Sequence, residues 1–470
     1  MRSRFRALAI AVIFLFSTVA SGCWDRTELE DVAWVQAMGF DKGPEGFLTT
    51  TMEIGVPRVL RGGMNVPSSG AGGPRYVTIT LVSRTALEAL DLVSLSLGRR
   101  LSLVHTQLFL FGEELAKSDL RPLMGAMDRF REVMGMTLVA VAHGRAEDIL
   151  RVNTSPLESS PTRFIQMLMQ HHPHTGLFEV TMFLRDLVGP IESSSRSPAC
   201  PIIALASDVQ TQSGSGTGGG GAGGQSSGGG GGGAATDPAQ QVPSSPEVGE
   251  RVEPKVDIES LPPGENVTAL EPWEVPKAGG GPLFVMGMAL FQGGKMVGIL
   301  SGDEARSILL VRNDLERTSL VVPDPTAPDK PELSIGVEIV GGKTDIEVNR
   351  IGSEVTLKVK SKVEVSYISP KTQTDYSDPR MTPLAEKAIA DHLKKYLDQT
   401  IAKTQALGTD PFGFGDKVKR TFLTWPEFES FAWFTKYPTA KIETVVEANI
   451  RRYGLDLRPL VIPPAELLQK

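Results

Sequence analysis

The stretch that decides the fold of the second half of the chain is EVTLKVKSKVEVSY, residues 354–367. Its apolar side chains occupy alternate positions and point to one face of an extended strand: Val355, Leu357, Val359, Val363 and Val365. The residues between them are mostly charged. One dry face and one wet face are typical of an antiparallel sheet. The preceding segments IGVEIV and TDIEVNRI are also strand-like, so we predict a sheet here.

A helix long enough to cover the dry face follows. We expect Thr382 to cap it, with Pro383 at its first position and its end near Gly408. Its apolar stripe is Leu384, Ala388, Leu393, Leu397 and Ile401. KIETVVEANIRRYG supplies a final strand. We therefore predict a C-terminal domain over 335–470, made of an antiparallel sheet and one long helix.

A compact β-β-α unit precedes this domain. Two strand-like runs flank a GGK turn, and a helix opens after Ser301 or Gly302 with Asp303 and Glu304 in its first turn. We assign this unit to a small middle domain over 279–334.

Residues 207–278 are rich in glycine, serine, proline and acidic residues, and 213–233 are nearly pure glycine and serine. Such a composition buries too little apolar area to offset its chain entropy. We predict a disordered linker or surface insertion. It is not a phosphate-binding loop, because no Gly-Lys-Ser/Thr ending follows its glycines.

The first half alternates between strand and helix patterns. AWVQAMGF and FLTTTMEIGV are expected to form a hairpin across DKGPEG, and RYVTITLV is a third strand. A helix follows from Thr85 to Gly98, then the strand QLFLFG, a helical stretch that Pro122 divides, and the strand MTLVAVAHG. This alternation predicts a mixed α/β domain over 23–206.

The chain begins with the three parts of a signal peptide. Arginines in the first six residues precede an apolar run over 7–19 and the small residues 20–22. Because Cys23 follows directly, a palmitate-bearing diacylglycerol can be attached to its thiol before cleavage between Gly22 and Cys23. We predict a lipoprotein signal peptide over 1–22. The alternatives are an ordinary signal peptide and a membrane span, but a span needs about 20 apolar residues.

The net charge of −7 gives a nucleic-acid partner no electrostatic support. The chain has 2 cysteines, so lipidation of Cys23 leaves Cys200 without a disulfide partner. We expect Cys200, in PACPIIAL, to be a small buried apolar residue.

We predict no catalytic, cofactor or metal site. GxSxG, HExxH and Walker motifs are absent from the sequence. A proline interrupts the histidines of HHPH (171–174), which favours a polar loop over a metal site. We expect His105 to make local hydrogen bonds, and acidic pairs such as Glu113 and Glu114 to be surface charges. The aromatic residues near the C-terminus favour core packing over a partner surface: Phe422, Trp425, Phe428, Phe431, Trp433 and Phe434.

Four blocks together resemble the Ger(x)C family, the lipoprotein C subunits of spore germinant receptors. They are GCWDRTELEDVAWVQAMGFDK, GRRLSLVHTQLFLFGEELAKSDLRPLMGAMDRFRE, FVMGMALFQGGKMVGILSGDEARSILLVRN, and DPFGFGDKVKR with the terminal IRRYGL. The resemblance spans nearly the whole chain after Gly22. The glycine-rich segment over 207–278 interrupts this resemblance and is a departure from the family pattern.

The resemblance implies an α+β fold of three domains, with mixed and antiparallel sheets flanked by helices. It implies a non-enzymatic subunit that works with an A subunit and a transporter-like B subunit on the outer face of the spore inner membrane. Cys23 carries over as the lipid site, and Trp24 and Asp25 match the family motif. Our leading hypothesis is a membrane-anchored receptor subunit. The alternatives are a solute-binding lipoprotein that captures the germinant and, less favoured, a peptidoglycan hydrolase.

Overall fold

The computed structural model describes residues 4–6, 10, 31–55, 76–152, 158, 160–170, 175–179, 182–205, 266–275, 283–330, 333–372 and 374–452. Gly22, Cys23, Trp24 and Asp25 lie outside these ranges, as do the rest of the expected signal peptide except 4–6 and 10, and the histidine run 171–174. Of the expected linker over 207–278, the structure describes 266–275.

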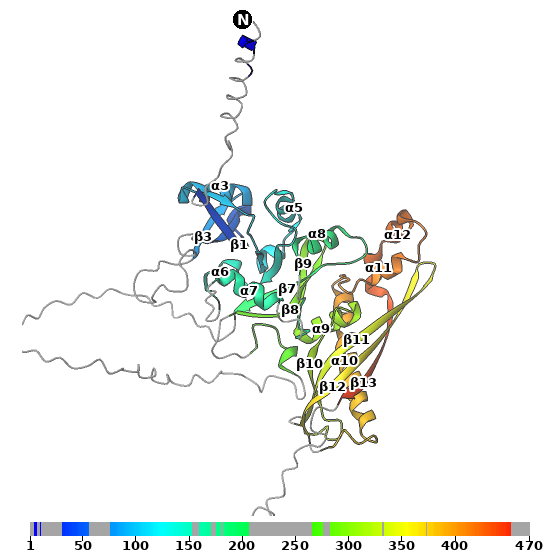
Figure 1. The fold of residues 1–470 in the computed structure, drawn as a ribbon. Helices are drawn as coiled ribbons and strands as arrows, with labels where there is room; N and C mark the ends of the chain where they lie inside the picture. Colours follow the sequence, from blue (N-terminus) through cyan, green and yellow to red (C-terminus); the bar gives the residue numbers. More distant parts are fainter. Residues whose placement is uncertain are drawn as a thin grey trace, which may run out of the picture.

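Two β-sheets flanked by helices form the body, which confirms the mixed α+β class (Figure 1). The first sheet has the order β3-β2-β1-β5-β6-β7-β8-β9, with β4 beside β1. Its strands are β1 (Val32–Lys42), β2 (Leu48–Gly55), β3 (Tyr76–Ser83), β4 (Arg100–Ser102), β5 (Leu108–Gly112), β6 (Leu138–Ala142), β7 (Ala199–Leu205), β8 (Leu283–Gln292) and β9 (Lys295–Leu300). The second sheet consists of β10 (Thr318–Pro323), β11 (Ser334–Ile351), β12 (Glu354–Lys371) and β13 (Lys441–Arg452).

Helices cover both faces of the first sheet. They are α3 (Ala86–Leu97), α4 (Glu113–Ala116), α5 (Arg121–Arg129), α6 (Ala146–Val152), α7 (Pro161–Gln170) and α8 (Leu184–Glu192). The buried residues of α3, α5 and α8 share one apolar cluster, and those of α6 and α7 share another. The later helices are α9 (Gly302–Arg312), α10 (Thr382–Ala406), α11 (Phe414–Lys419), α12 (Trp425–Phe431) and α13 (Trp433–Lys436), with short 3-10 turns η2 (Pro44–Gly46), η4 (Val267–Ala269) and η5 (Tyr437–Thr439).

The centre of the first sheet is parallel and its flanks are antiparallel hairpins. β1, β4, β5, β6 and β7 run in one direction. The hairpin β1–β2 forms across the predicted turn, and helix α3 ends at Gly98, whose φ of 62° is left-handed. Pro122 lies in the first turn of α5, so it separates α4 from α5 as expected.

The β-β-α segment is bonded into the first sheet. Strand β8 pairs with β7 in antiparallel register, Cys200 opposite Ala289, and β8 continues through the GGK turn into β9. Ser301 is the N-cap of α9, and it forms a capping box with Glu304. The division into three domains stays a prediction, but strands from two of the expected domains share this sheet.

The five apolar residues predicted for one face of β12 are all buried. Strand β12 pairs with β11 along its length in antiparallel register, as predicted. Strand β13 instead lies parallel to β12, with Thr356 opposite Lys441, so the prediction of an entirely antiparallel sheet is wrong. The reason is the connection: α10 to α13 carry the chain back to the end where β12 begins, as a parallel crossover requires.

The predicted start of α10 differs from the observed one. Met381 is the N-cap, and its side chain makes no capping hydrogen bond. Thr382 cannot cap the helix because it is already helical, and its hydroxyl donates to the carbonyl of Tyr376 at 3.0 Å. Leu384 is exposed, whereas Leu393, Leu397 and Ile401 are buried as predicted. The stripe instead begins at Ala385, which lies four residues before Ile389 on the buried face.

No helix in the described ranges is both long enough and apolar enough to cross a bilayer.

A carboxyl group is buried on β2. Glu53 is 1% exposed, Thr162 of α7 donates its backbone N–H to Oε1 at 3.4 Å, and Oε2 has no hydrogen-bond partner. Burial raises the pKa of Glu53 to about 7 from an ordinary value of 4.5.

We therefore predict that Glu53 makes stability depend on pH. The folded state keeps the proton up to about pH 7 and the unfolded chain releases it near 4.5, so the free energy of unfolding falls between these values as pH rises. The loss is about 3 kcal/mol in total. Glu53→Gln should remove this slope and exceed the wild type in stability at pH 8, as measured by urea unfolding. The exposed Glu354→Gln is the control, and a slope retained in Glu53→Gln would contradict the assignment.

Candidate functional site

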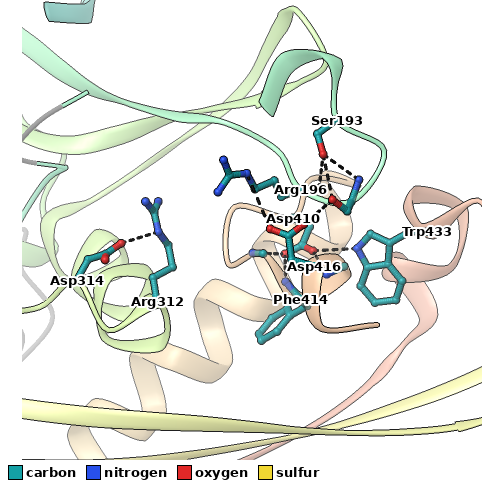
Figure 2. A network of polar contacts seen from close by, with 11 residues as sticks. Ser193, Arg196, Arg312, Asp314, Asp410, Phe414, Asp416 and Trp433 are labelled. Carbon is teal, nitrogen blue, oxygen red and sulfur yellow. Dashed lines mark hydrogen bonds and ion pairs between the residues drawn. The ribbon is translucent and has the colours of Figure 1, made fainter. Parts of the chain in front are cut away.

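A loop that begins at Asp410 joins the two halves of the molecule. The Asp410 carboxylate is fully buried and accepts backbone N–H groups from Gly413 at 3.0 Å, Phe414 at 3.2 Å and Gly415 at 2.8 Å. The indole N–H of Trp433 donates to the same carboxylate at 2.9 Å (Figure 2). Four donors from one short segment and α13 thus converge on one side chain.

Two opposing effects set the pKa of Asp410. Burial is the larger and raises it to about 6, while the N–H donors of Gly415, Trp433, Phe414 and Gly413 act to lower it. The net value leaves the carboxylate ionised at neutral pH. A buried charge of this kind stays in a fold only where hydrogen bonds satisfy it, so the loop geometry depends on Asp410.

The glycines of this loop are required by its conformation. Gly413 has a φ of 75°, which is left-handed. A Cβ on Gly415 would lie 2.0 Å from the carbonyl oxygen of Ser195 and 2.5 Å from the Trp433 ring. The loop therefore passes close to the chain that leads into β7.

Hydrogen bonds join the loop to the first sheet. The backbone N–H of Ser197 donates to the carbonyl of Asp410 at 2.9 Å, and the backbone N–H of Asp410 donates to the Ser197 hydroxyl at 3.1 Å. The hydroxyl of Ser195 donates to the Asp416 carboxylate at 2.5 Å, and that of Thr409 to the carbonyl of Phe291 in β8 at 2.6 Å. These contacts join segments about 120 to 220 residues apart in sequence.

A bidentate ion pair makes a second connection nearby. Arg312, at the end of α9, donates to both oxygens of Glu179 at 2.8 and 2.9 Å, and to Asp314 at 2.9 Å. Figure 2 shows Arg312 and Asp314 beside the Asp410 loop. Paired N–H groups of a guanidinium fix the orientation as well as the distance of a carboxylate.

Between these two connections lies a cleft of about 460 Å³. The described residues that line it include basic and acidic side chains: Arg196, Arg312, Lys417 and Arg420, and Glu179, Asp186, Asp314 and Asp416. Arg312 is held by carboxylates, and Arg196 is 3.9 Å from Asp416. In the described part of the chain, Lys417 and Arg420 have no ion-pair partner.

The cleft is lined mainly by polar and charged side chains. No histidine or cysteine is among its described lining residues. The described ranges also contain no group of three or more histidine, cysteine or acidic residues that could hold a metal ion. What remains is a polar recess with both signs of charge.

The other residues singled out from the sequence lie away from this cleft. The ring of His105 is exposed and packs against Trp34 with centroids 4.7 Å apart. Glu113 binds Lys117 at 2.8 Å and lies 3.0 Å from His143, whose ring stacks on Trp273. Cys200 is buried as predicted, and burial raises the pKa of its thiol.

The aromatic cluster divides into core and surface. Phe428 and Trp433 are buried, which confirms core packing for them. Trp425 is 45% exposed, and the ammonium of Lys419 lies 4.1 Å from its ring centroid. Core packing was therefore wrong for Trp425.

Sequence reasoning missed Asp410, Ser195 and the cleft. The available signal was the Asp-Pro-Phe-Gly-Phe-Gly run at 410–415, in which an acid precedes two glycines. That pattern indicates a tight loop, but it does not reveal which distant segment the loop contacts.

Family models match both halves of the chain. A model described as "Spore germination protein N-terminal domain" matches residues 25–205, and one described as "Spore germination B3/ GerAC like, C-terminal" matches residues 286–454. The two matches lie on either side of the glycine-rich segment.

Curated relatives from Bacillus subtilis (strain 168) agree with these matches. Spore germination protein KC is 23% identical over 461 residues, covering 97% of this chain and 98% of the relative. Putative spore germination protein YfkR is 20% identical over 443 residues, covering 94% and 95%. A solved structure titled "Crystal Structure of the GerBC protein" gives a TM-score of 0.47 at 12% identity, covering 88% of this chain and 96% of that one.

We predict that Trp433→Phe weakens the junction. The change removes one N–H donor from the buried Asp410 carboxylate and should lower the free energy of unfolding by about 2 kcal/mol. Trp425→Phe is the matched control, since Trp425 is half exposed, and should change it by less than about 0.5 kcal/mol. Urea unfolding of both variants measures the difference. Equal effects would contradict the role assigned to the indole N–H.

Proposed function

The chain belongs to the Ger(x)C family of spore germination proteins, and on that premise we propose that it is a non-catalytic, membrane-anchored subunit of a nutrient germinant receptor. The observation that carries the proposal is the pair of family matches, which follow each other in order and together take in most of the described body. We assign it a role in assembling the receptor or transmitting its signal.

In this proposal Cys23 carries the membrane anchor. Cleavage between Gly22 and Cys23 leaves a diacylglyceryl cysteine at the N-terminus, which holds the protein on the extracytoplasmic face of the spore inner membrane. Two acyl chains on one residue meet the usual requirement for stable anchoring. The basic, apolar and small-residue order of 1–22 supports this assignment.

The partners in this proposal are the A and B subunits of the receptor. The ion pair of Arg312 with Glu179 and the hydrogen bonds around Asp410 support a stiff connection between the two sheets. A stiff body anchored at one end can hold membrane-embedded subunits in a fixed relation.

The cleft favours one alternative, a lipoprotein that captures the germinant for a transporter-like partner. Its volume of about 460 Å³ suits a small solute. Lys417 and Arg420, which have no ion-pair partner in the described ranges, could bind a carboxylate.

Affinity isolation from detergent-solubilised spore membranes tests the leading proposal. We expect the tagged protein to recover a transporter-like membrane protein and a larger A-type subunit. Cys23→Ala should lose or weaken this recovery, whereas Cys200→Ala, the control at the buried cysteine, should keep it. Recovery of the lipoprotein alone, or full activity of a soluble Cys23→Ala protein, would contradict the proposal.

Calorimetry of the mature chain with amino acids and sugars tests the alternative. If the cleft captures a solute with a carboxylate, titration should give heat that Lys417→Ala reduces. The exposed Lys387→Ala, on α10 and not among the lining residues of the cleft, should leave it unchanged. Absence of heat with every solute would remove the alternative and leave the receptor-subunit proposal standing.

A further inference from the structure

The parallel strands of the first sheet all begin along one edge of the layer, the edge formed by the strand ends and not by an outer strand. Val32 of β1 lies opposite Arg100 of β4, and Leu108 of β5 lies opposite Leu138 of β6. Helices α3 and α5 return the chain to this edge before β4 and β6, so their C-terminal ends lie there too. Figure 1 shows α3 and α5 in the half of the molecule that lies away from the second sheet.

Exposed apolar side chains gather at this edge. Leu95 near the end of α3 is 81% exposed, and Met134 and Met136 before β6 are 54% and 60% exposed. The loops are joined, because Glu132 accepts the backbone N–H of Leu103 at 2.9 Å. We call the residues of this edge the anchor-side face: Leu95, Arg99, Arg100, Val104, Arg129, Arg131, Met134 and Met136.

Arginines lie within a few residues of these apolar side chains in the sequence. In the described part of the chain, Arg99, Arg129 and Arg131 have no carboxylate within ion-pair distance. Arg100 pairs with Glu132 at 3.1 Å, and Arg185 with Asp186 at 3.4 Å. The exposed acids close to these residues in sequence are Asp31, Asp91 and Asp128. The face thus presents guanidinium groups of Arg99, Arg129 and Arg131 that no described carboxylate pairs with, on a chain whose net charge is −7.

The chain enters the body at the same edge. Strand β1 begins at Val32, nine residues after Cys23. An extended chain of that length reaches at most about 30 Å. A lipid on Cys23 therefore keeps the beginning of β1 within about 30 Å of the bilayer.

We propose that the anchor-side face lies against the membrane surface and binds anionic phospholipid. Leu95, Met134 and Met136 enter the boundary between headgroups and acyl chains, and the free arginines bind lipid phosphates. Exposed apolar side chains among arginines match the chemistry of this boundary. The inference rests on the proposed lipid anchor, and it adds an orientation: the first sheet stands with this edge on the bilayer.

Reporter fluorescence on tethered protein tests the orientation without native lipidation. The mature chain carries a polyhistidine tag in place of Cys23 and is held on vesicles of phosphatidylglycerol and phosphatidylethanolamine that contain a nickel-chelating lipid. An environment-sensitive dye is attached at Leu95→Cys or Met134→Cys. The remaining native cysteine, Cys200, is buried. Leu384→Cys, on α10 in the second half, is the matched control because Leu384 is also an exposed leucine.

We expect the dye at residues 95 and 134 to shift to shorter wavelength and to be quenched by spin-labelled lipid, and the dye at residue 384 to do neither. Met134→Asp with Met136→Asp should reduce quenching at residue 95, with the melting temperature unchanged. Equal signals at all three positions would overturn the inference. So would a shift at 95 and 134 that needs added receptor subunits, since the face would then bind protein. Either result leaves the anchor at Cys23 to be judged by the Cys23→Ala isolation.

Discussion

The fold depends on one buried ion pair in a helix that is buried almost all round. Asp303 and Arg306 of α9 bind each other and are at most 3% exposed. Thr268 donates to Asp303 at 2.9 Å, and Arg306 donates to the hydroxyl of Thr318 at 3.2 Å. Removing either charge would leave the other unpaired in the interior, which is strongly unfavourable. In Figure 1, α9 lies between β8 and β9 on one side and β11 and β12 on the other, so this pair fixes how the sheets meet.

The Asp410 loop, at the same junction, also depends on a buried charge that is satisfied by hydrogen bonds. A buried carboxylate is satisfied by N–H groups from its own loop and from Trp433, and the loop then bonds to Ser195 and Ser197. The Asp410 carboxylate itself is fully buried, so water cannot replace a bond that is lost there. Together with the ion pair of Arg312 and Glu179, the hydrogen bonds of this loop connect the two sheets at several points.

A body connected in this way suits the proposed role as a subunit that holds other receptor subunits in a fixed relation. The cleft lies at the junction of the sheets, whereas the anchor-side face lies on the first sheet, where β1 begins. In the proposed anchored state, an orientation imposed at the membrane would reach the second sheet through α9 and the Asp410 loop. The long strands β11 to β13 of the second sheet carry paired charges, such as Lys360 with Glu347, on a solvated face.

Sequence alone determined the features that depend on local periodicity. The alternation in 354–367 gave the buried face of β12, and the glycine at 98 and the capping residues at 301 and 304 gave helix ends, because these depend on neighbours within a few residues. The parallel placement of β13, the pairing of β8 with β7 and the environment of Asp410 were decided by tertiary structure. The two strand pairings and the bonds between Asp410 and Ser197 need partners more than 70 residues away, and the free energy of such contacts depends on burial that no local pattern records.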